Sequence, residues 1–314
     1  MPRFGSCTIL AVLVAAACGP TPRAANDAAG ATADATKSDA PLIQPTSDAP
    51  QVATGPVHVV ITADNAYSFG YGDDAQITNF TQGTRALTAG DIFNCPVGVG
   101  PEAYDIAAAD APDGAYLYIV TWDDLEVTQG VIGQFTRDTG TVLTGDARFD
   151  VCGTGLDYST GSDSLVGPDL ATINQQIAIC NAGTGDPTTT TRGWVNTAGA
   201  VTPGATGALA VGQDNSGSGS EFQIACQQTP TMDGVRSDAH WMWWDPQTGQ
   251  DPFEATGENT FHAFLIFRLP AAVIIESPAN AGRAAASQTL RSSIESPANA
   301  GRAAASQTLR SSIQ

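Results

Sequence analysis

The chain has 314 residues, with 32 acidic against 13 basic side chains, a net charge of −19 at pH 7. Only 14% of the residues are charged, and the 33 glycines and 19 prolines favour a loop-rich protein of mainly β structure. Between residues 56 and 270 lie 26 of the acids and six arginines, so this segment is close to −20. Such a body repels nucleic acid and anionic membrane surfaces. Its expected partners are neutral polymers, cations or basic proteins; alternatively, the charge serves solubility alone.

Residues 1–17 have the pattern of an export signal, with Arg3 as a short basic start. Thr8 to Ala17 form an apolar run of ten residues, whereas a membrane-spanning helix needs about 20. The three alanines before Cys18 resemble the lipobox of bacterial lipoproteins. This resemblance implies that Cys18 is lipidated and anchors the exported chain in the cell envelope, at the outer membrane or cell surface. The alternative is ordinary cleavage that leaves Cys18 as a spare thiol.

Residues 18–55 are rich in Ala, Asp, Thr and Pro and contain no aromatic residue. They offer too little apolar surface to offset the entropy of ordering, so we expect a disordered tether. Four cysteines remain beyond it: Cys95, Cys152, Cys180 and Cys226. An even number in an exported domain predicts two disulfides, of which three connectivities stay open.

Residues 57–61 and 66–71 both alternate in polarity or size around the turn residues Asp64 and Asn65. This pattern predicts a β-hairpin. Tyr67, Phe69 and Tyr71 would share one face of the second strand and bury there, although a ligand-binding rim is the alternative.

Further strands are expected at 115–122, which is apolar on both faces, and at 129–135, 176–180, 221–226 and 261–269. Turns rich in Gly, Asp, Pro and Ser separate them, and no stretch shows sustained helical periodicity. Residues 56–270 are therefore predicted to form one all-β domain, a β-sandwich or jelly roll carrying the two disulfides.

The stretch TADNAYSFGYG, residues 62–72, resembles a strand pair of galactose-binding-like jelly rolls in bacterial secreted proteins. It departs from that pattern at Tyr71, where asparagine usually precedes the glycine. The resemblance implies a jelly roll and carbohydrate as a ligand.

The stretch HWMWWD, residues 240–245, holds three of the five tryptophans. Exposed indoles are flat platforms for sugar rings, and a nearby carboxylate accepts hydroxyl hydrogen bonds. The candidate ligand-binding residues are Trp241, Trp243, Trp244 and Asp245. The alternative is that these tryptophans seal the core.

Acidic residues cluster at Asp105, Asp110 and Asp113, which makes calcium the one cofactor to consider, since calcium takes several carboxylate oxygens. No EF-hand loop is present, and solvated turn residues are the alternative reading. The sequence also contains no HExxH, G-x-S-x-G or glycine-rich phosphate loop.

We therefore expect a non-enzymatic, lipid-anchored protein that binds a glycan or an envelope protein. The alternatives are a secreted polysaccharide hydrolase and a purely structural envelope protein.

The tail, residues 271–314, contains an identical 19-residue repeat, from Ile275 to Ser293 and from Ile294 to Ser312. Perfect identity indicates a recent duplication, and the composition predicts an unstructured tail. The alternative is a short interaction tag doubled for avidity.

Overall fold

A computed structural model describes residues 55–275 except for 65, 86–91, 96–99, 123–127, 139, 158–166, 186–190, 218, 220, 230–231 and 255–262. The predictions for the export signal with Cys18, the tether up to residue 54 and the repeats beyond Ile275 lie outside these residues. Among the described residues, no helix has the length and apolar character needed to cross a membrane.

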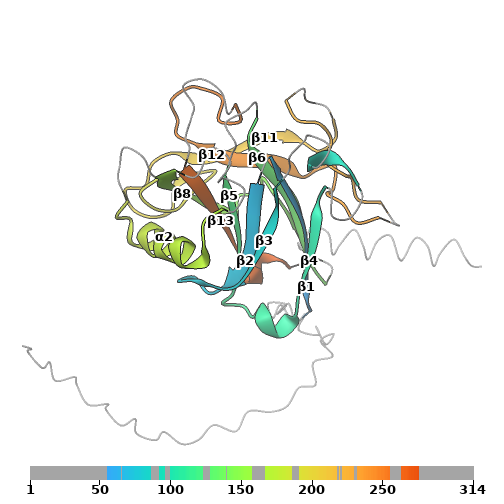
Figure 1. Cartoon of the computed structure of the whole chain (residues 1–314), viewed down its shortest axis with the longest axis horizontal. Coiled ribbons are helices and arrows are strands. Elements are labelled where there is room, and N and C mark those ends of the chain that lie inside the picture. The colour runs from blue at the N-terminus through green and yellow to red at the C-terminus, as the bar shows by residue number, and fades with distance from the viewer. Residues whose placement is uncertain are drawn as a thin grey trace, which may run out of the picture. The chain divides into compact units, whose positions relative to one another are not determined.

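The described body consists of two antiparallel sheets packed against each other, which confirms the predicted β-sandwich (Figure 1). The first, here called the β1 sheet, runs in the order β11 (Ala208–Asp214), β12 (His240–Asp245), β6 (Gly130–Arg137), β1 (Val57–Asp64) and β4 (Glu102–Ile106), with β7 (Gly140–Leu143) also paired to β6. The second, the β5 sheet, runs in the order β10 (Gly199–Ala200), β9 (Val195–Asn196), β8 (Asp150–Asp157), β13 (Ala263–Pro270), β5 (Tyr116–Trp122), β2 (Ala66–Gly72) and β3 (Ile77–Arg85).

The predicted hairpin at the start of the body is wrong, although both of its strands exist. β1 pairs with β4 and β6, whereas β2 pairs with β3 and β5, so the chain passes from one sheet to the other between them. Both strands are buried along almost their whole length and need a bonded neighbour on each side. Turn residues signal a change of direction, but they do not decide whether the flanking strands bond to each other.

The strand predicted at 176–180 is also wrong, because these residues lie in the helix α2 (Leu170–Ala182). Asp169 caps its start by accepting a hydrogen bond from the Thr172 amide at 2.7 Å, and Gly183 ends it at φ 66°. Its buried side chains recur at helical spacing: Ile173, Gln176, Ile177 and Cys180. The five residues 176–180, from which the strand was predicted, are too few to show this spacing.

The segment 221–226, predicted as a strand, follows an irregular path instead. The side chain of Asn215 accepts a hydrogen bond from the Ala225 amide at 2.8 Å and donates one to the Ala225 carbonyl at 3.1 Å. This buried amide thus takes the place that a neighbouring strand would fill. The strands predicted at 115–122, 129–135 and 261–269 correspond to β5, β6 and β13.

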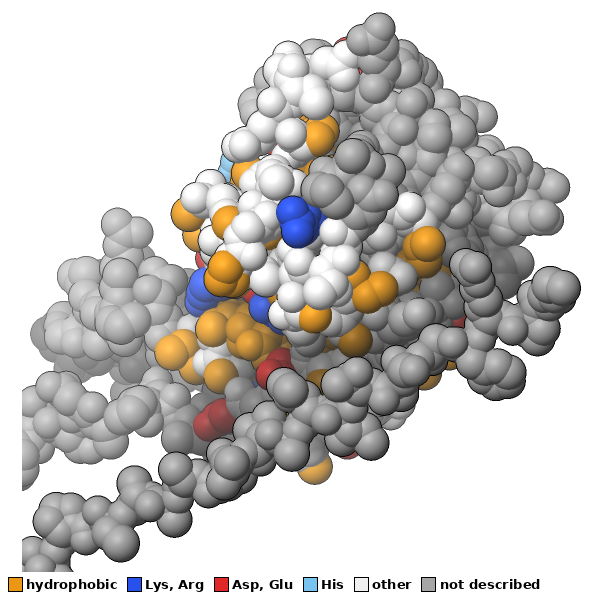
Figure 2. Space-filling view, turned by 90° about the vertical axis from the view of Figure 1, so that its left-hand side faces the viewer, with side chains coloured by type: hydrophobic (Ala, Val, Ile, Leu, Met, Phe, Trp, Pro, Cys, Tyr) orange, Lys and Arg blue, Asp and Glu red, His pale blue; other side chains and the backbone are white. Residues whose placement is uncertain are grey.

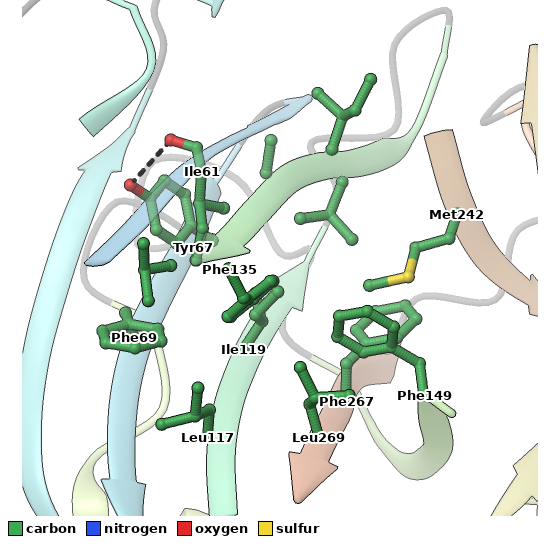
Figure 3. Close-up of a cluster of buried hydrophobic side chains, with 14 of the residues drawn as sticks. Ile61, Tyr67, Phe69, Leu117, Ile119, Phe135, Phe149, Met242, Phe267 and Leu269 are labelled. Carbon is green, nitrogen blue, oxygen red and sulfur yellow. Dashed lines mark hydrogen bonds between the residues drawn. The ribbon is translucent and has the colours of Figure 1, made fainter. Parts of the chain in front are cut away.

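The interior has two apolar clusters, one on each face of the β5 sheet. Figure 3 shows the cluster between the sheets, into which Leu117 and Ile119 of β5 point together with Phe135 and Phe267. The alternate residues of β5 belong to a second cluster, which includes Ile173 and Ile177 of α2. β5 is therefore covered on both faces, as predicted, and α2 forms a third layer next to β3 and β8 (Figure 1).

The four cysteines of the body form two nested disulfides. Cys152–Cys180 joins β8 to α2, and Cys95–Cys226 joins two irregular segments. Their sequence separations of 28 and 131 residues correspond to about 3.6 and about 5 kcal/mol of stabilisation for each bridge alone on the chain-entropy estimate. Two such bridges are compatible with an extracellular protein.

Figure 2 shows the side of the body that lies on the left in Figure 1. Hydrophobic side chains gather on this face, and arginine side chains are visible beside a few acidic ones.

Candidate functional site

The tryptophans of β12 do not form an exposed platform, so this prediction is wrong. Trp241, Trp243 and Trp244 are 0%, 1% and 3% exposed. The Trp241 ring stacks on Phe222 with the ring centroids 4.2 Å apart and the planes 10° from parallel. The carboxylate of Asp245 accepts a hydrogen bond from the Gln247 amide in the turn that follows β12. The alternative reading, in which these indoles seal the core, is the correct one.

The three aspartates proposed as calcium ligands are not brought together. Asp105 lies on β4 and pairs with the His58 ring at 2.7 Å, whereas Asp110 ends the short helix η1 (Ala108–Asp110) and Asp113 lies in the following turn. Within the described ranges, no group of three or more His, Cys, Asp or Glu side chains is arranged to hold a metal ion. The calcium prediction is therefore wrong for these three residues, which lie on a strand, a short helix and a turn.

A shallow polar depression of about 340 Å³ lies beside β7 and the start of β12. Its charged side chains already bond to one another: Arg236 donates to Asp238 at 2.6 Å, and Asp146 accepts from Arg148 at 2.7 Å. His240, also in the lining, bonds to the Gly212 carbonyl through Nδ1 at 2.8 Å. These charged groups and His240 already have hydrogen-bond partners within the protein. We therefore do not assign a ligand to this depression.

A cleft of about 300 Å³ opens between the edges of the two sheets, where β4 of the β1 sheet faces β2 and β3 of the β5 sheet. We call it the edge cleft. It lies where the inter-sheet space reaches the surface, because β3 and β4 are the last strands of their sheets. Its lining residues are Phe69, Gly70, Tyr71, Asn79, Thr81, Ala103, Tyr104, Asp105 and Ile106.

Aromatic rings form the apolar part of the edge cleft. The ring centroids of Phe69 and Tyr104 are 4.7 Å apart. Phe69 is buried and points from β2 toward the inter-sheet core, as Tyr67 does (Figure 3). Tyr71, two residues further along the same strand, is only partly buried. The aromatic face of β2 therefore starts in the core and ends at the cleft.

A buried hydrogen-bond network fixes the position of the Tyr104 ring. Its hydroxyl donates to Glu102 Oε2 at 2.6 Å and lies 3.0 Å from the Tyr67 hydroxyl, which in turn lies 3.0 Å from Glu102 Oε2. Burial, together with Tyr104 and Glu102, raises the pKa of Tyr67 well above its ordinary value. Burial and the bond to Glu102 likewise raise the pKa of Tyr104. Both phenols therefore stay protonated, and their hydrogen bonds hold the Tyr104 ring beside Tyr67 and Glu102.

The polar rim of the cleft consists mostly of neutral side chains. Asn79 and Thr81 are exposed on β3, and Asp105 on β4 supplies the one charge among the lining residues. Aromatic rings beside amide, hydroxyl and carboxylate groups are the combination that suits a sugar, which has apolar ring faces and polar hydroxyls.

The sequence predictions found this site only in part. Tyr67 and Phe69 are buried, as expected. Tyr71 instead lines the cleft, which agrees with the alternative hypothesis of a ligand-binding rim on this strand. Asn79, Thr81 and Tyr104 were missed as binding residues, since nothing in their local sequence shows that β3 and β4 end the two sheets. Comparisons with protein-family models, with curated proteins and with solved structures find no match for this chain.

Proposed function

We propose that this chain is an exported, lipid-anchored, non-enzymatic protein whose β-sandwich binds a glycan of the envelope or the surroundings in the edge cleft. The observation that carries the proposal is the partly exposed pair Tyr71 and Tyr104 beside the neutral groups of Asn79 and Thr81. Export and anchoring are supported by the lipobox-like sequence before Cys18 and by the two disulfides.

Binding is favoured over hydrolysis by the charges of the cleft. A glycosidase of the common kind uses two carboxyl groups placed on either side of the scissile bond, about 5–9.5 Å apart. The described lining residues supply a single carboxylate, that of Asp105, and it bonds to His58. The polysaccharide-hydrolase alternative thus has no pair of catalytic acids in this cleft.

Binding is tested by applying the purified full chain to an immobilised glycan library and then titrating the best ligand by calorimetry. We expect Tyr71→Ala to weaken binding at least about tenfold. Leu156→Ala is the matched control, because Leu156 is a partly exposed apolar residue of the same sheet outside the cleft. If no glycan binds, the structural alternative replaces this proposal; if labelled polysaccharide is cleaved, the hydrolase alternative does.

The anchor is tested separately by mass spectrometry of the mature N-terminus. We expect a diacyl or triacyl modification on Cys18, and Cys18→Ser should release the protein from the membrane fraction. An unmodified N-terminus at another residue would contradict the anchored part of the proposal and leave the binding part standing.

A further inference from the structure

We propose that Cys95 is a site of thiol–disulfide exchange: a dithiol reduces the Cys95–Cys226 disulfide in the folded protein and thereby uncovers one side of the Trp241 ring. The Cys152–Cys180 disulfide stays closed under the same conditions. The inference does not depend on the proposed glycan binding, since none of these four cysteines lines the edge cleft.

The two disulfides differ in their access to solvent. Cys95 is exposed, and its partner Cys226 is buried. Cys152 and Cys180 are both buried and belong to the second apolar cluster, which includes residues of α2. A thiolate must contact the sulfur that it attacks, so exposed disulfides are the ones that exchange readily. Of the two bridges, Cys95–Cys226 therefore admits a thiol, and it does so at its Cys95 end.

The exchange has two steps. One thiolate of the dithiol attacks Cys95 Sγ, forms a mixed disulfide there and releases Cys226 as a thiolate, which takes up a proton. The second thiolate of the dithiol then attacks the dithiol sulfur of the mixed disulfide and releases Cys95 as a thiolate, which is protonated in turn. The protein disulfide thus gains two electrons and two protons, and the dithiol loses both and leaves as a cyclic disulfide.

The bridge joins the two irregular segments whose rings cover Trp241. Phe222, four residues before Cys226, stacks on the Trp241 ring with the centroids 4.2 Å apart. Phe93, two residues before Cys95, meets the same ring edge-on, with the centroids 5.9 Å apart and the planes at 63°. The disulfide therefore fixes two aromatic rings against one buried indole.

The segment of Phe222 is also held by hydrogen bonds that the disulfide does not supply. Asn215 accepts from the Ala225 amide at 2.8 Å and donates to the Ala225 carbonyl at 3.1 Å. Gln213 donates to the Phe222 carbonyl at 2.5 Å. These bonds come from β11 and the residue after it, so they persist when the bridge opens.

Residues 92–95 depend more on the bridge. The Ile92 carbonyl accepts a hydrogen bond from Thr62 Oγ1 at 3.0 Å at the start of this segment, and the disulfide holds its end. Phe93 lies between the two and is only partly buried. Opening the bridge frees the end of the segment, so Phe93 moves away from Trp241 while the other ring stays stacked.

The first experiment measures which bridge opens. The full chain is incubated without denaturant with dithiothreitol at about pH 8, where thiols are partly ionised, and free thiols are alkylated at intervals and mapped by peptide mass spectrometry. We expect Cys95 and Cys226 to be labelled at least about tenfold faster than Cys152 and Cys180, because the buried bridge reacts only after local opening. Equal rates, or faster labelling of the buried pair, overturn the inference.

The second experiment measures what the opening uncovers. After selective reduction and alkylation, amide hydrogen exchange should rise at least about tenfold in residues 92–95 and stay unchanged in residues 221–226, with the circular dichroism spectrum retained. Quenching of tryptophan fluorescence by acrylamide should also rise on reduction. Phe93→Ala, in which the ring is already absent, should show no such rise, whereas the control Leu156→Ala should behave as the unaltered protein does.

Three results of this second experiment contradict the inference. They are unchanged exchange in residues 92–95, exchange that rises over the whole body, and a rise in quenching that persists in Phe93→Ala. None of them bears on glycan binding, which is measured on the unreduced protein.

Discussion

The tryptophan strand β12 and the edge cleft are both rich in aromatic side chains, yet they differ in burial and in access to solvent. Trp241 and Trp243 lie on a strand with bonded neighbours on both sides, and both rings are fully buried. Tyr71 lies near the end of β2, one strand in from the edge strand β3, and Tyr104 lies on the edge strand β4; both side chains are only partly buried. The density of aromatic residues in the sequence therefore does not mark the site. What marks it is the opening of the space between the two sheets to the surface, beside the edge strands β3 and β4.

The sharpest way to break this comparison is to remove a ring from β12. Trp241→Ala should lower the free energy of unfolding by about 3–5 kcal/mol, because it deletes a fully buried indole stacked on Phe222. Urea unfolding followed by circular dichroism measures this loss. Molecules that remain folded should bind glycan with unchanged affinity. If Trp241→Ala leaves stability unchanged and abolishes binding, the two regions have been assigned the wrong way round.

The disulfide between β8 and α2 gives the next largest effect. Cys152→Ser combined with Cys180→Ser should lower the free energy of unfolding by about 3.6 kcal/mol, because the unfolded chain regains the entropy of a loop of 28 residues. The edge cleft should keep its affinity, since neither cysteine lines it. A loss of binding without a loss of stability would show that the outer helix layer contributes to the site.

Removing a ring from the edge cleft should have the reverse effect of removing one from β12: it should weaken binding and leave stability nearly unchanged. Tyr71→Ala should weaken glycan binding at least about tenfold, which corresponds to about 1.4 kcal/mol. It should change the free energy of unfolding by less than about 1 kcal/mol, since the side chain is only partly buried. Calorimetric titration and urea unfolding of the same sample provide both numbers. Equal loss in Leu156→Ala would mean that the effect on binding is indirect.

The smallest effect concerns Glu221, the residue before the Phe222 ring that stacks on Trp241. Burial, together with the charges of Asp251 and Glu254, raises the pKa of Glu221 to about 7 from its ordinary 4.5. The folded protein therefore binds this proton more tightly than the unfolded chain, and stability falls as the pH rises from about 4.5 to about 7.

Glu221→Gln removes that dependence. The variant should be more stable than the unaltered protein at pH 8, and the two should agree below about pH 4.5, where Glu221 is protonated in both states. Thermal unfolding over this pH series measures the difference, with the exposed Asp113→Asn as a control for the loss of one charge. A constant difference at all pH values would show that the stability change does not come from this proton.

The sandwich class followed from the sequence because alternating apolar residues and turn residues are local signals. Central strands such as β5, apolar on both faces, could be recognised from their own residues. The partners of β1 could not, since they lie more than forty residues further along the chain: β1 pairs with Glu102–Ile106 and Gly130–Arg137. The helix α2 was not predicted, because residues 176–180 alone are too short a stretch to show the helical spacing of its buried side chains.

The site depends on the same non-local information. Trp241 is buried and Tyr71 is partly exposed because of how distant segments pack around their strands, which the composition of β12 and β2 does not encode. The one local hint was Tyr71 itself, the position at which the sequence departs from the galactose-binding-like pattern and the residue that the cleft exposes.

The most direct test is a residue-by-residue map of ligand contact. The isotope-labelled full chain is titrated with the best-binding neutral oligosaccharide, and the amide chemical shifts are followed by nuclear magnetic resonance. The account predicts that the largest shifts fall on Tyr71, Thr81 and Tyr104, with residues 240–245 unmoved. Shifts concentrated at residues 240–245, with the cleft residues unchanged, would contradict it.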